Sequence, residues 1–356
     1  MIGAMGTDVK AELRFLAALV HRGHLEAAAA EPLAKGLQAG GDLDELLAEA
    51  GFDDAWIERM RRTNAGEIPE LPGFQIQKRL GVGGTAVVWK ALEQKTRRTV
   101  ALKVLRPEMA ANPAELKAFV EEARLLQRLA AEARIEGLVR GYGVARAGKT
   151  VFARLEWIDG RTLLERLDED GPFTEPEALA IVLSVARTLA ALEAEGIVHR
   201  DLKPGNIMLA RPSGDRGKTR RVVLIDLGFA AASGAAGKAG AGTGTVAYLS
   251  PEEARGGAAA DSRSDIYSLG ASLFQLVVGR LPFDSSDDRE VLRMQVMESL
   301  SSPELKGRGF TPHLYYFIEK MMAKDVAHRY QSWQALIDDI AAQLEGREDL
   351  DFRKRR

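Results

Sequence analysis

The sequence lacks cysteine altogether, and it lacks an excess of charge of either sign. The absence of cysteine excludes a disulfide framework, a thiolate nucleophile and a cysteine-ligated zinc site, so oxygen and nitrogen groups must carry any chemistry. The 49 lysines and arginines nearly balance the 51 acidic residues, and the net charge of −2 argues against a dedicated nucleic-acid-binding protein. The 356 residues are long enough for two or three domains with their own cores.

Long hydrophobic runs are also missing. The two most apolar stretches, Ala178 to Ala186 and Leu269 to Val278, are interrupted by polar side chains and are too short to span a bilayer. No signal segment is visible. We therefore expect a cytoplasmic protein, with membrane association left open only through a segment outside these residues.

The first 63 residues show the pattern of short amphipathic helices, each with apolar side chains on one stripe. Asp42 and Asp53 are typical N-cap residues and predict the starts of two of these helices. This part is expected to be a small accessory or regulatory module that packs on its neighbour or self-associates, because so short a domain is marginally stable alone. Proline and glycine in residues 64–73 indicate a linker.

The hydrophobic period changes after this linker. Apolar residues alternate from Phe74 to about Leu105, which predicts antiparallel strands. Helical patterns dominate from Asn112 onward, with Pro113 at the expected first position of a helix. The sequence therefore predicts an α+β fold in which a sheet-rich lobe precedes a helix-rich lobe. The expected divisions are residues 1–63 (helical module), 64–73 (linker), 74–158 (sheet-rich lobe), 159–345 (helix-rich lobe) and 346–356 (charged tail).

A glycine-rich turn with Gly81, Gly83 and Gly84 separates the first two expected strands. Main-chain amides without side chains can approach phosphate oxygens closely. The residues that follow, Val87 to Lys90, have strand character, so neither a Walker loop nor a dinucleotide fingerprint fits. A hairpin that covers a nucleotide does fit, and a tight β-turn that needs positive φ is the alternative.

A lysine and a glutamate are predicted to meet inside the sheet-rich lobe. Lys103 shares a strand face with Ala101 and Leu105, and an ammonium on a buried face needs an anion. In the helix expected after Pro113, Glu122 falls on the apolar stripe and Glu121 on the solvated one. A Lys103–Glu122 ion pair would hold the ammonium against the α- and β-phosphates of a nucleotide.

The strongest pattern is HRDLKPGN at residues 199–206, followed by LIDLG at residues 224–228. Phosphoryl transfer requires a carboxylate to orient the attacking hydroxyl, a cation near the γ-phosphate, and oxygen ligands for magnesium. Asp201 is the candidate carboxylate and Lys203 the candidate cation. Asn206 and Asp226 supply hard oxygen donors for the metal.

With these motifs in this order, the sequence resembles the eukaryotic-like (Hanks-type) bacterial serine/threonine protein kinases from about Phe74 to Leu344. The resemblance implies a bilobal protein-kinase fold, ATP as phosphoryl donor, Mg²⁺ as cofactor and serine or threonine hydroxyls of proteins as acceptors. It also implies a nucleotide-contacting set in which Leu155 is the gatekeeper and Asp159 borders the ribose. That set comprises Gly81, Gly83, Gly84, Val88, Ala101, Lys103, Glu122, Leu155, Glu156, Ile158 and Asp159.

The resemblance extends beyond the nucleotide. The segment from Gly244 to Glu252 resembles the substrate-docking segment of the family, in which Thr245 would contact the catalytic Asp and Lys. Asp265 would brace the catalytic loop, and Glu252 would pair with Arg329. The departures from the family pattern are Ala86, Leu227, Val246 and Ser250. None of these removes a group expected to touch phosphate or magnesium, so an active enzyme is expected.

The resemblance further suggests regulation by phosphorylation, because Arg200 precedes Asp201 and would hold a phosphorylated loop residue. Thr243 is the first candidate acceptor, Ser233 the second, and Thr245 is favoured as a docking residue. The chain is thus expected to autophosphorylate and to act in signalling. Two other functions stay open at this point: an ATP-binding pseudokinase scaffold that recruits partners through its helical module, and a small-molecule phosphotransferase.

Overall fold

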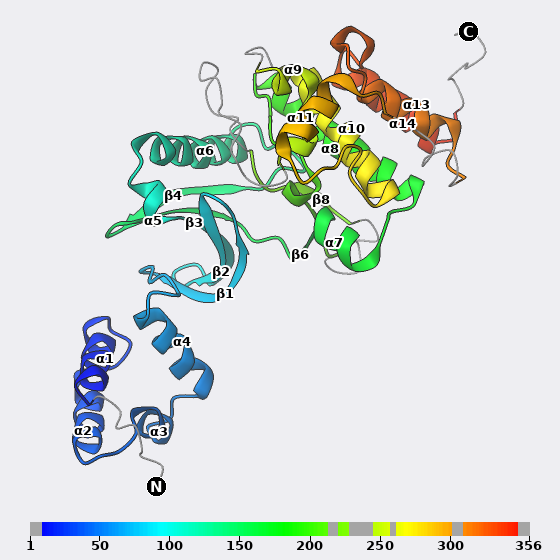
Figure 1. The fold of residues 1–356 in the computed structure, drawn as a ribbon. Coiled ribbons are helices and arrows are strands. Elements are labelled where there is room, and N and C mark those ends of the chain that lie inside the picture. The colour runs from blue at the N-terminus through cyan, green and yellow to red at the C-terminus, as the bar shows by residue number, and fades with distance from the viewer. Residues whose placement is uncertain (1–8, 213–219, 228–244, 257–260, 301–308, 348–356) are drawn as a thin grey trace. The chain divides into compact units, whose positions relative to one another are not determined.

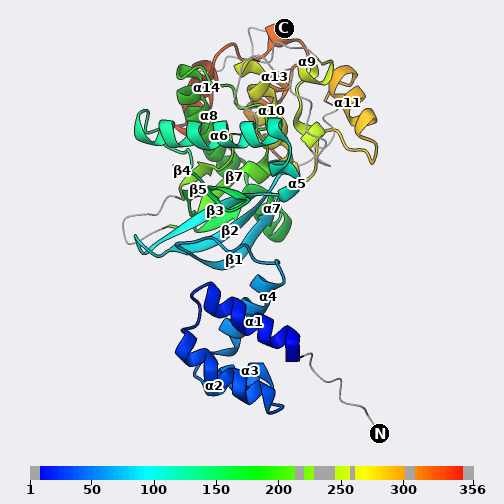
Figure 2. The ribbon, with the colours of Figure 1, turned by 90° about the vertical axis from the view of Figure 1, so that its left-hand side faces the viewer.

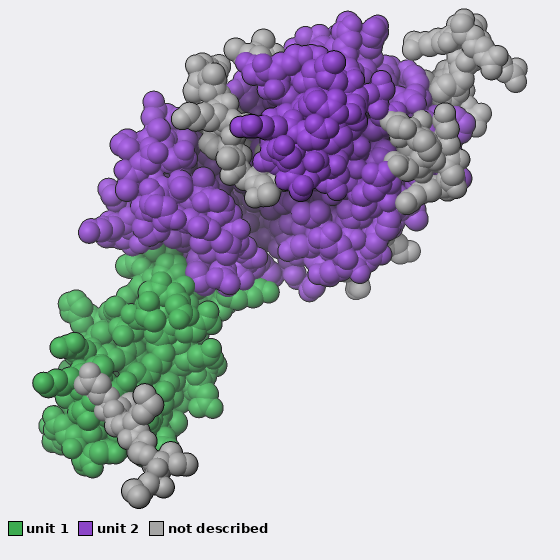
Figure 3. All heavy atoms as spheres, viewed as in Figure 1, with its two compact units in different colours: residues 1–78, 91–98 green, residues 79–90, 99–356 purple. Residues whose placement is uncertain are grey.

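The computed structural model describes residues 9–212, 220–227, 245–256, 261–300 and 309–347 (Figure 1). The chain forms two compact units. The first contains residues 1–78 and 91–98, and the second contains residues 79–90 and 99–356 (Figure 3).

The described residues of the first unit form four helices, α1 (Val9–His21), α2 (Ala27–Gln38), α3 (Leu43–Glu49) and α4 (Asp54–Asn64). The two predicted N-caps are confirmed. The Asp42 carboxylate accepts hydrogen bonds from the main-chain N of Asp44 (2.9 Å) and Glu45 (3.2 Å), and Asp53 accepts one from Trp56 N (2.7 Å). The apolar stripes meet in a separate small core made of Phe15, Leu16, Leu19, Leu25, Leu33, Leu37, Leu43, Leu47, Ile57 and Met60.

A single arginine ties three of these helices together. Arg61 of α4 donates to both carboxylate oxygens of Glu12 on α1 (2.8 and 2.5 Å) and to Asp44 on α3 (2.7 Å). Its guanidinium also lies 4.4 Å from the centre of the Phe15 ring. Because a guanidinium has five donors in a fixed plane, it can satisfy two carboxylates while its face packs on an aromatic ring.

A five-stranded sheet has the order β1-β2-β3-β5-β4. Its strands are β1 (Phe74–Val82), β2 (Ala86–Glu93), β3 (Arg98–Leu105), β4 (Gly141–Ala147) and β5 (Thr150–Glu156). The β3 and β5 strands are antiparallel, with Ala101 opposite Leu155 and Lys103 opposite Ala153. Side chains alternate between the faces of a strand, so Ala101 and Lys103 project from the same face.

Helix α6 (Pro113–Ala131) crosses one face of this sheet at β4 and β5, and the short α5 (Pro107–Ala110) precedes it (Figures 1 and 2). The start of α6 is fixed locally. The Asn112 side chain accepts a hydrogen bond from Ala114 N (3.0 Å), and Pro113 occupies the first turn, where its missing N–H removes no bond. Phe119, Ala123, Leu126 and Leu129 are the buried face of the helix.

Gly141 in β4 allows α6 to approach the sheet closely. A Cβ at this position would lie 2.7 Å from both Gln127 N and Leu126 Cβ on α6. We expect Gly141→Ala to push α6 outward and to lower stability by about 1–3 kcal/mol, because main-chain atoms cannot move aside cheaply. Since α6 also carries Glu122, any activity that depends on this residue should fall with stability. Chemical unfolding and an activity assay check this. Gly148→Ala, where φ is +56° and no atom lies within 4 Å of a Cβ, gives the cost of backbone strain without a steric clash. Wild-type stability in Gly141→Ala would contradict the close approach.

The remaining elements are mostly helical. A three-stranded sheet of order β6-β7-β8 lies among them and consists of β6 (Gly160–Thr162), β7 (Ile207–Ala210) and β8 (Val222–Leu224). The helices are α7 (Leu163–Asp170), α8 (Glu175–Ala194), α9 (Pro251–Ala254), α10 (Ser262–Val278), α11 (Asp288–Met297), α13 (Pro312–Met321) and α14 (Trp333–Leu344), with 3₁₀ turns η1 (Pro204–Asn206), η2 (Thr245–Tyr248) and η3 (Val326–His328).

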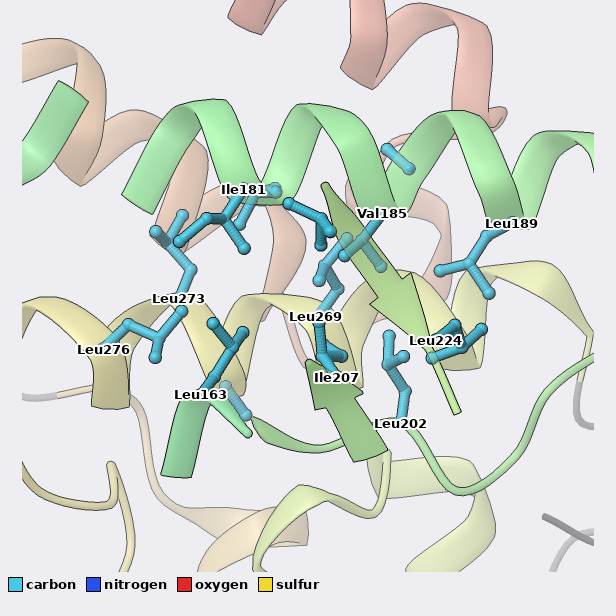
Figure 4. Packing of buried hydrophobic residues seen from close by; sticks show 14 of the residues in the cluster. Leu163, Ile181, Val185, Leu189, Leu202, Ile207, Leu224, Leu269, Leu273 and Leu276 are labelled. Carbon is cyan, nitrogen blue, oxygen red and sulfur yellow. The ribbon is translucent and has the colours of Figure 1, made fainter. Parts of the chain in front are cut away.

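The core of this helical part supports the loop that contains Asp201 and Lys203. In Figure 4, Ile181 and Val185 of α8 lie over Leu269 of α10, and Ile207 and Leu202 come from the segment below them. Leu202 is 1% exposed, so the residue between Asp201 and Lys203 is anchored in the core. Among the described residues, no helix is both long and apolar enough to cross a membrane. The predicted α+β fold, with a helical segment before a sheet-rich and then a helix-rich part, is confirmed.

Candidate active site

Three charged side chains from distant parts of the sequence meet beside β3. Lys103 Nζ lies 2.9 Å from Glu122 Oε1 on α6 and 3.1 Å from Asp226 Oδ1, which follows β8. The Lys103 and Glu122 side chains are only 15% and 14% exposed, whereas Asp226 is 31% exposed. The expected Lys103–Glu122 ion pair is therefore present, and the structure adds Asp226 as a second anion.

The attraction between these groups outweighs the effect of burial on the pKa for Lys103 and Asp226, but not for Glu122. Burial acts to lower the pKa of the Lys103 ammonium, but the Asp226 and Glu122 carboxylates raise it well above its usual range. Burial likewise acts to raise the pKa of Asp226, yet Lys103 holds it well below its usual range. For Glu122, burial and the Asp226 charge together raise the pKa despite Lys103. Lys103 therefore stays a cation, and Asp226 stays an anion available to a metal.

The catalytic-loop candidates form a second cluster. Lys203 Nζ donates to both carboxylate oxygens of Asp201, at 2.8 and 2.9 Å. Asn206 Nδ2 donates to the Asp201 main-chain O (2.8 Å) and to its Oδ2 (2.9 Å). These contacts fix the carboxylate in one orientation, which is what a group that must position a substrate hydroxyl requires.

The loop before Asp201 is braced from α10. Asp265 is 2% exposed, and its two oxygens accept hydrogen bonds from His199 N (2.7 Å) and Arg200 N (2.8 Å). The tight loop turns through Arg200, which has a φ of 65°. A left-handed conformation is unfavourable for a side chain of this size, and here the two bonds to Asp265 compensate. The predicted bracing contact is confirmed.

A main-chain contact connects the two clusters. His199 Nε2 lies 2.6 Å from the main-chain O of Asp226, so the catalytic loop and the Lys103 cluster share one framework. Ile225 N also donates to Asn206 O at 2.9 Å, where β8 runs beside β7. The chain thus places Asp226 next to Asn206.

The donor set fits magnesium. Because Asn206 Nδ2 is committed to Asp201, the amide presents its Oδ1 as the remaining metal-binding atom. Asp226 contributes a carboxylate. In the part of the chain that the structure describes, no group of three or more acidic or histidine side chains could hold a metal by itself. Magnesium commonly binds through one or two protein oxygens together with substrate phosphates and waters, so two donors suit it.

The glycine-rich turn is built for access by a ligand. Gly81 lies near the end of β1, and the backbone turns back where Gly83 N donates to Ala86 O (2.9 Å). None of Gly81, Gly83 and Gly84 has positive φ, so the alternative of a turn that needs a left-handed residue is wrong. A Cβ on Gly81 or Gly84 would meet no atom within 4 Å. The glycines therefore leave space above the backbone, as a phosphate-covering turn requires.

The residues expected around adenine lie in one apolar cluster. Ala101, Leu155 and Ile158 are 7–8% exposed, and Val88 packs against the same cluster. Glu156 and Asp159, which are also expected to contact the nucleotide, have ionic partners. Glu156 pairs with Arg221 at 2.8 Å, and Asp159 lies 3.6 Å from Arg211, contacts for which the sequence pattern gave no signal. A role for Asp159 beside the ribose stays a prediction.

The segment just after β5, residues 157–158, holds another contact that the sequence did not indicate. Lys90 Nζ of β2 lies 3.8 Å from the centre of the Trp157 ring, one residue beyond β5. A cation over an indole face is stabilising. This contact links the strand that bears Val88 to the segment that bears Glu156 and Ile158.

The segment predicted to dock the acceptor is held by the helical part. The turn η2 begins at Thr245, and Ser250 caps α9, with its main-chain N and Oγ both donating to Glu253. Glu252 and Arg329 form the predicted pair, with both guanidinium–carboxylate contacts at 2.7 Å and the Arg329 side chain fully buried. Thr243 and Ser233 lie outside the described residues, so their predicted roles are untested.

The Glu252–Arg329 pair predicts a specific pH dependence of stability. Burial acts to raise the pKa of Glu252, but hydrogen bonds from Arg329 and Ser264 lower it from 4.5 to about 2. Because the pKa in the folded state is the lower one, the pair contributes stability above about pH 4.5 and loses it as the pH falls toward 2. Glu252→Gln should therefore lose less stability than wild type between pH 5 and 3, measured by urea unfolding. Identical losses in both proteins would contradict this, and Glu121→Gln, an exposed change, is the control.

Comparison with known proteins gives a consistent result. A family model described as a protein kinase domain matches residues 74–339. Serine/threonine-protein kinase PknB of Mycobacterium tuberculosis is 32% identical over 271 residues, which cover 75% of this chain and 42% of that protein. The probable serine/threonine-protein kinase PknB of Corynebacterium glutamicum is 34% identical over 276 residues, with 75% and 41% covered. The chain thus spans about two fifths of the length of these relatives.

A solved structure supports the same fold. The crystal structure of Rad53 residues 1–466 in complex with AMP-PNP aligns with a TM-score of 0.62 at 22% identity, covering 81% of this chain and 69% of that one. This structural likeness shows the fold of the chain, and the match to the family model shows its family. The chain belongs to the protein kinase family, with Hanks-type bacterial serine/threonine kinases as its relatives.

Proposed function

We propose that this chain is an ATP- and Mg²⁺-dependent kinase that transfers the γ-phosphoryl group of ATP to serine or threonine hydroxyls of proteins. The observation that supports this most strongly is that Lys103, Glu122 and Asp226 meet in one cluster, which His199 joins to the loop of Asp201. Phosphoryl transfer requires positioning and charge stabilisation more than covalent chemistry, and these residues supply both.

The proposed reaction follows from the positions of the side chains. Asp201 accepts a hydrogen bond from the acceptor hydroxyl and directs its oxygen at the γ-phosphorus. A bond forms between that oxygen and phosphorus, the bond to the β–γ bridging oxygen breaks, and ADP leaves with the electron pair. The hydroxyl proton passes to Asp201. Lys203, held on Asp201, stabilises negative charge on the transferred group, and Lys103 holds the α- and β-phosphates.

Asn206 and Asp226 are the residues that would hold magnesium. When bound, Mg²⁺ neutralises charge on the β- and γ-phosphates. Asp226 is suited to this role because Lys103 keeps it ionised, and the main-chain contact of His199 fixes its position.

The function can be tested by direct transfer. The protein is incubated with γ-labelled ATP, Mg²⁺ and a generic protein acceptor, and the labelled amino acids are identified after hydrolysis. We expect label in phosphoserine and phosphothreonine and none when Mg²⁺ is chelated. Nucleotide binding without transfer would instead indicate a pseudokinase scaffold.

The buried Nε atom of Arg200 supports a role for phosphorylation in regulation. Arg200 Nε is buried without a hydrogen-bond partner among the described residues, an arrangement that an anionic partner would relieve. We infer that phosphorylated Thr243 is that partner, with Ser233 as the second candidate. Mass spectrometry after incubation with ATP identifies the acceptors, and unchanged turnover in Thr243→Ala would contradict the inference.

A cytoplasmic location, a signalling role and self-association through residues 1–63 also belong to this proposal.

A further inference from the structure

Three buried polar side chains hold the docking segment at η2. Gln295 Nε2 of α11 donates to Ala247 O at 2.6 Å, and Ser268 Oγ of α10 donates to Tyr248 O at 2.7 Å. The Tyr248 hydroxyl donates to Gln275 Oε1 of α10 at 2.6 Å. Main-chain and side-chain atoms of the segment are thus fixed from two helices.

Gln295 differs from the other two because its amide is itself held in place. Its side chain is completely buried, and its Oε1 accepts a hydrogen bond from the Tyr267 hydroxyl of α10. This contact leaves Nε2 as the atom directed at Ala247 O. An amide fixed at both ends can hold the main chain at a defined position, because rotation would leave buried polar atoms unpaired.

A lysine completes the chain of contacts. Lys324 Nζ, which lies between α13 and η3, donates to the Tyr267 hydroxyl at 3.0 Å and to the main-chain O of Gln295 at 2.7 Å. Its ammonium also lies 4.2 Å from the centre of the Phe283 ring. The same lysine therefore contacts both the residue that orients the Gln295 amide and the backbone that carries it.

We propose that Gln295, oriented by Tyr267 and Lys324, is a positioning residue for the protein acceptor: it sets the main chain of the docking segment at Ala247 and thereby determines acceptor affinity. This inference rests on the proposed kinase function. The proposal assigns different substrates to two sets of side chains. Lys103, Glu122 and Asp226 serve the nucleotide, and Gln295 serves the polypeptide through its contact with Ala247 O.

The test measures steady-state kinetics for two substrates separately. In Gln295→Met, which keeps the side-chain length but removes both hydrogen bonds, we expect the KM for the protein acceptor to rise by about three- to tenfold. The KM for ATP and the kcat at saturating acceptor should stay within about twofold of wild type, because the nucleotide contacts are unchanged. Tyr267→Phe keeps the Gln295 side chain and removes its orienting hydroxyl, and it should shift the acceptor KM in the same direction.

Ser272→Ala is the matched control. Ser272 also lies on α10 and donates one buried hydrogen bond, to Ser268 O at 2.9 Å, and this bond stays within α10. Its acceptor KM should equal that of wild type at similar thermal stability. An unchanged acceptor KM in Tyr267→Phe, or parallel losses in both KM values and kcat, would overturn the positioning role. Absence of transfer in wild type would instead overturn the kinase function itself.

Discussion

Replacement of Asp201 by asparagine is expected to lower kcat by roughly 10²–10⁴-fold, the range typical for loss of a positioned general base. The asparagine keeps the size of the side chain and one acceptor oxygen for Lys203, whose contacts to Asp201 are 2.8 and 2.9 Å. It cannot take the proton of the acceptor hydroxyl. The loss should therefore appear in kcat, while ATP affinity and thermal stability stay close to wild type.

The measurement is the initial rate of phosphate transfer at saturating ATP, with nucleotide affinity determined separately by calorimetry. Asp338→Asn, an exposed change on α14, is the matched carboxylate-to-amide control. Equal rates for wild type and Asp201→Asn would remove Asp201 from the reaction. A rate loss accompanied by an equal loss of ATP affinity would assign it to nucleotide binding.

Replacement of Arg329 by methionine is expected to lower the free energy of unfolding of the second unit by about 3–5 kcal/mol. This loss is a large fraction of the roughly 5–15 kcal/mol by which a folded domain is typically stable. Arg329 makes two 2.7 Å contacts with Glu252, and its Nε donates to Ala323 O at 2.7 Å. Methionine fills part of the volume but leaves a partly buried carboxylate without its cation. Removing one partner of such a pair is much more damaging than never having had the pair.

Urea unfolding followed by intrinsic fluorescence measures this loss. Arg263→Met is the control, because Arg263 and its partner Asp261 are 34% and 48% exposed, and an exposed ion pair contributes only about 0–1 kcal/mol. The two substitutions thus remove the same charge, but from sites that differ in burial. A similar loss in both variants, or none in Arg329→Met, would show that the buried pair does not stabilise the fold.

Much of the site could be predicted because its residues are fixed by local periodicity. Glu122 was separated from Glu121 by the helical stripe alone, and Glu121 indeed lies on the exposed side, 3.8 Å from Lys117. The start of α6 at Pro113 and the N-caps at Asp42 and Asp53 were also predictable, since capping is a contact between neighbours in sequence.

The rest depends on contacts between segments far apart in the chain. Gln295 carries no motif, and a single glutamine in an amphipathic helix is normally solvated, so only tertiary structure shows that it reaches Ala247. The pairs of Glu156 with Arg221 and Asp159 with Arg211 were missed for the same reason. Glycine posed the opposite problem. Sequence alone left open whether Gly81 and Gly84 were needed for positive φ or for access, and the backbone angles and the open space around them favour access.

We expect Asp226, kept ionised by Lys103, to bind the metal that accompanies ATP. Calorimetric titration with ATP, with and without Mg²⁺, tests it without reference to turnover, using wild type, Asp226→Asn and the exposed control Asp288→Asn. We predict that Mg²⁺ tightens ATP binding in wild type and in the control, and that this gain is lost in Asp226→Asn. An undiminished Mg²⁺ effect in Asp226→Asn would contradict the account.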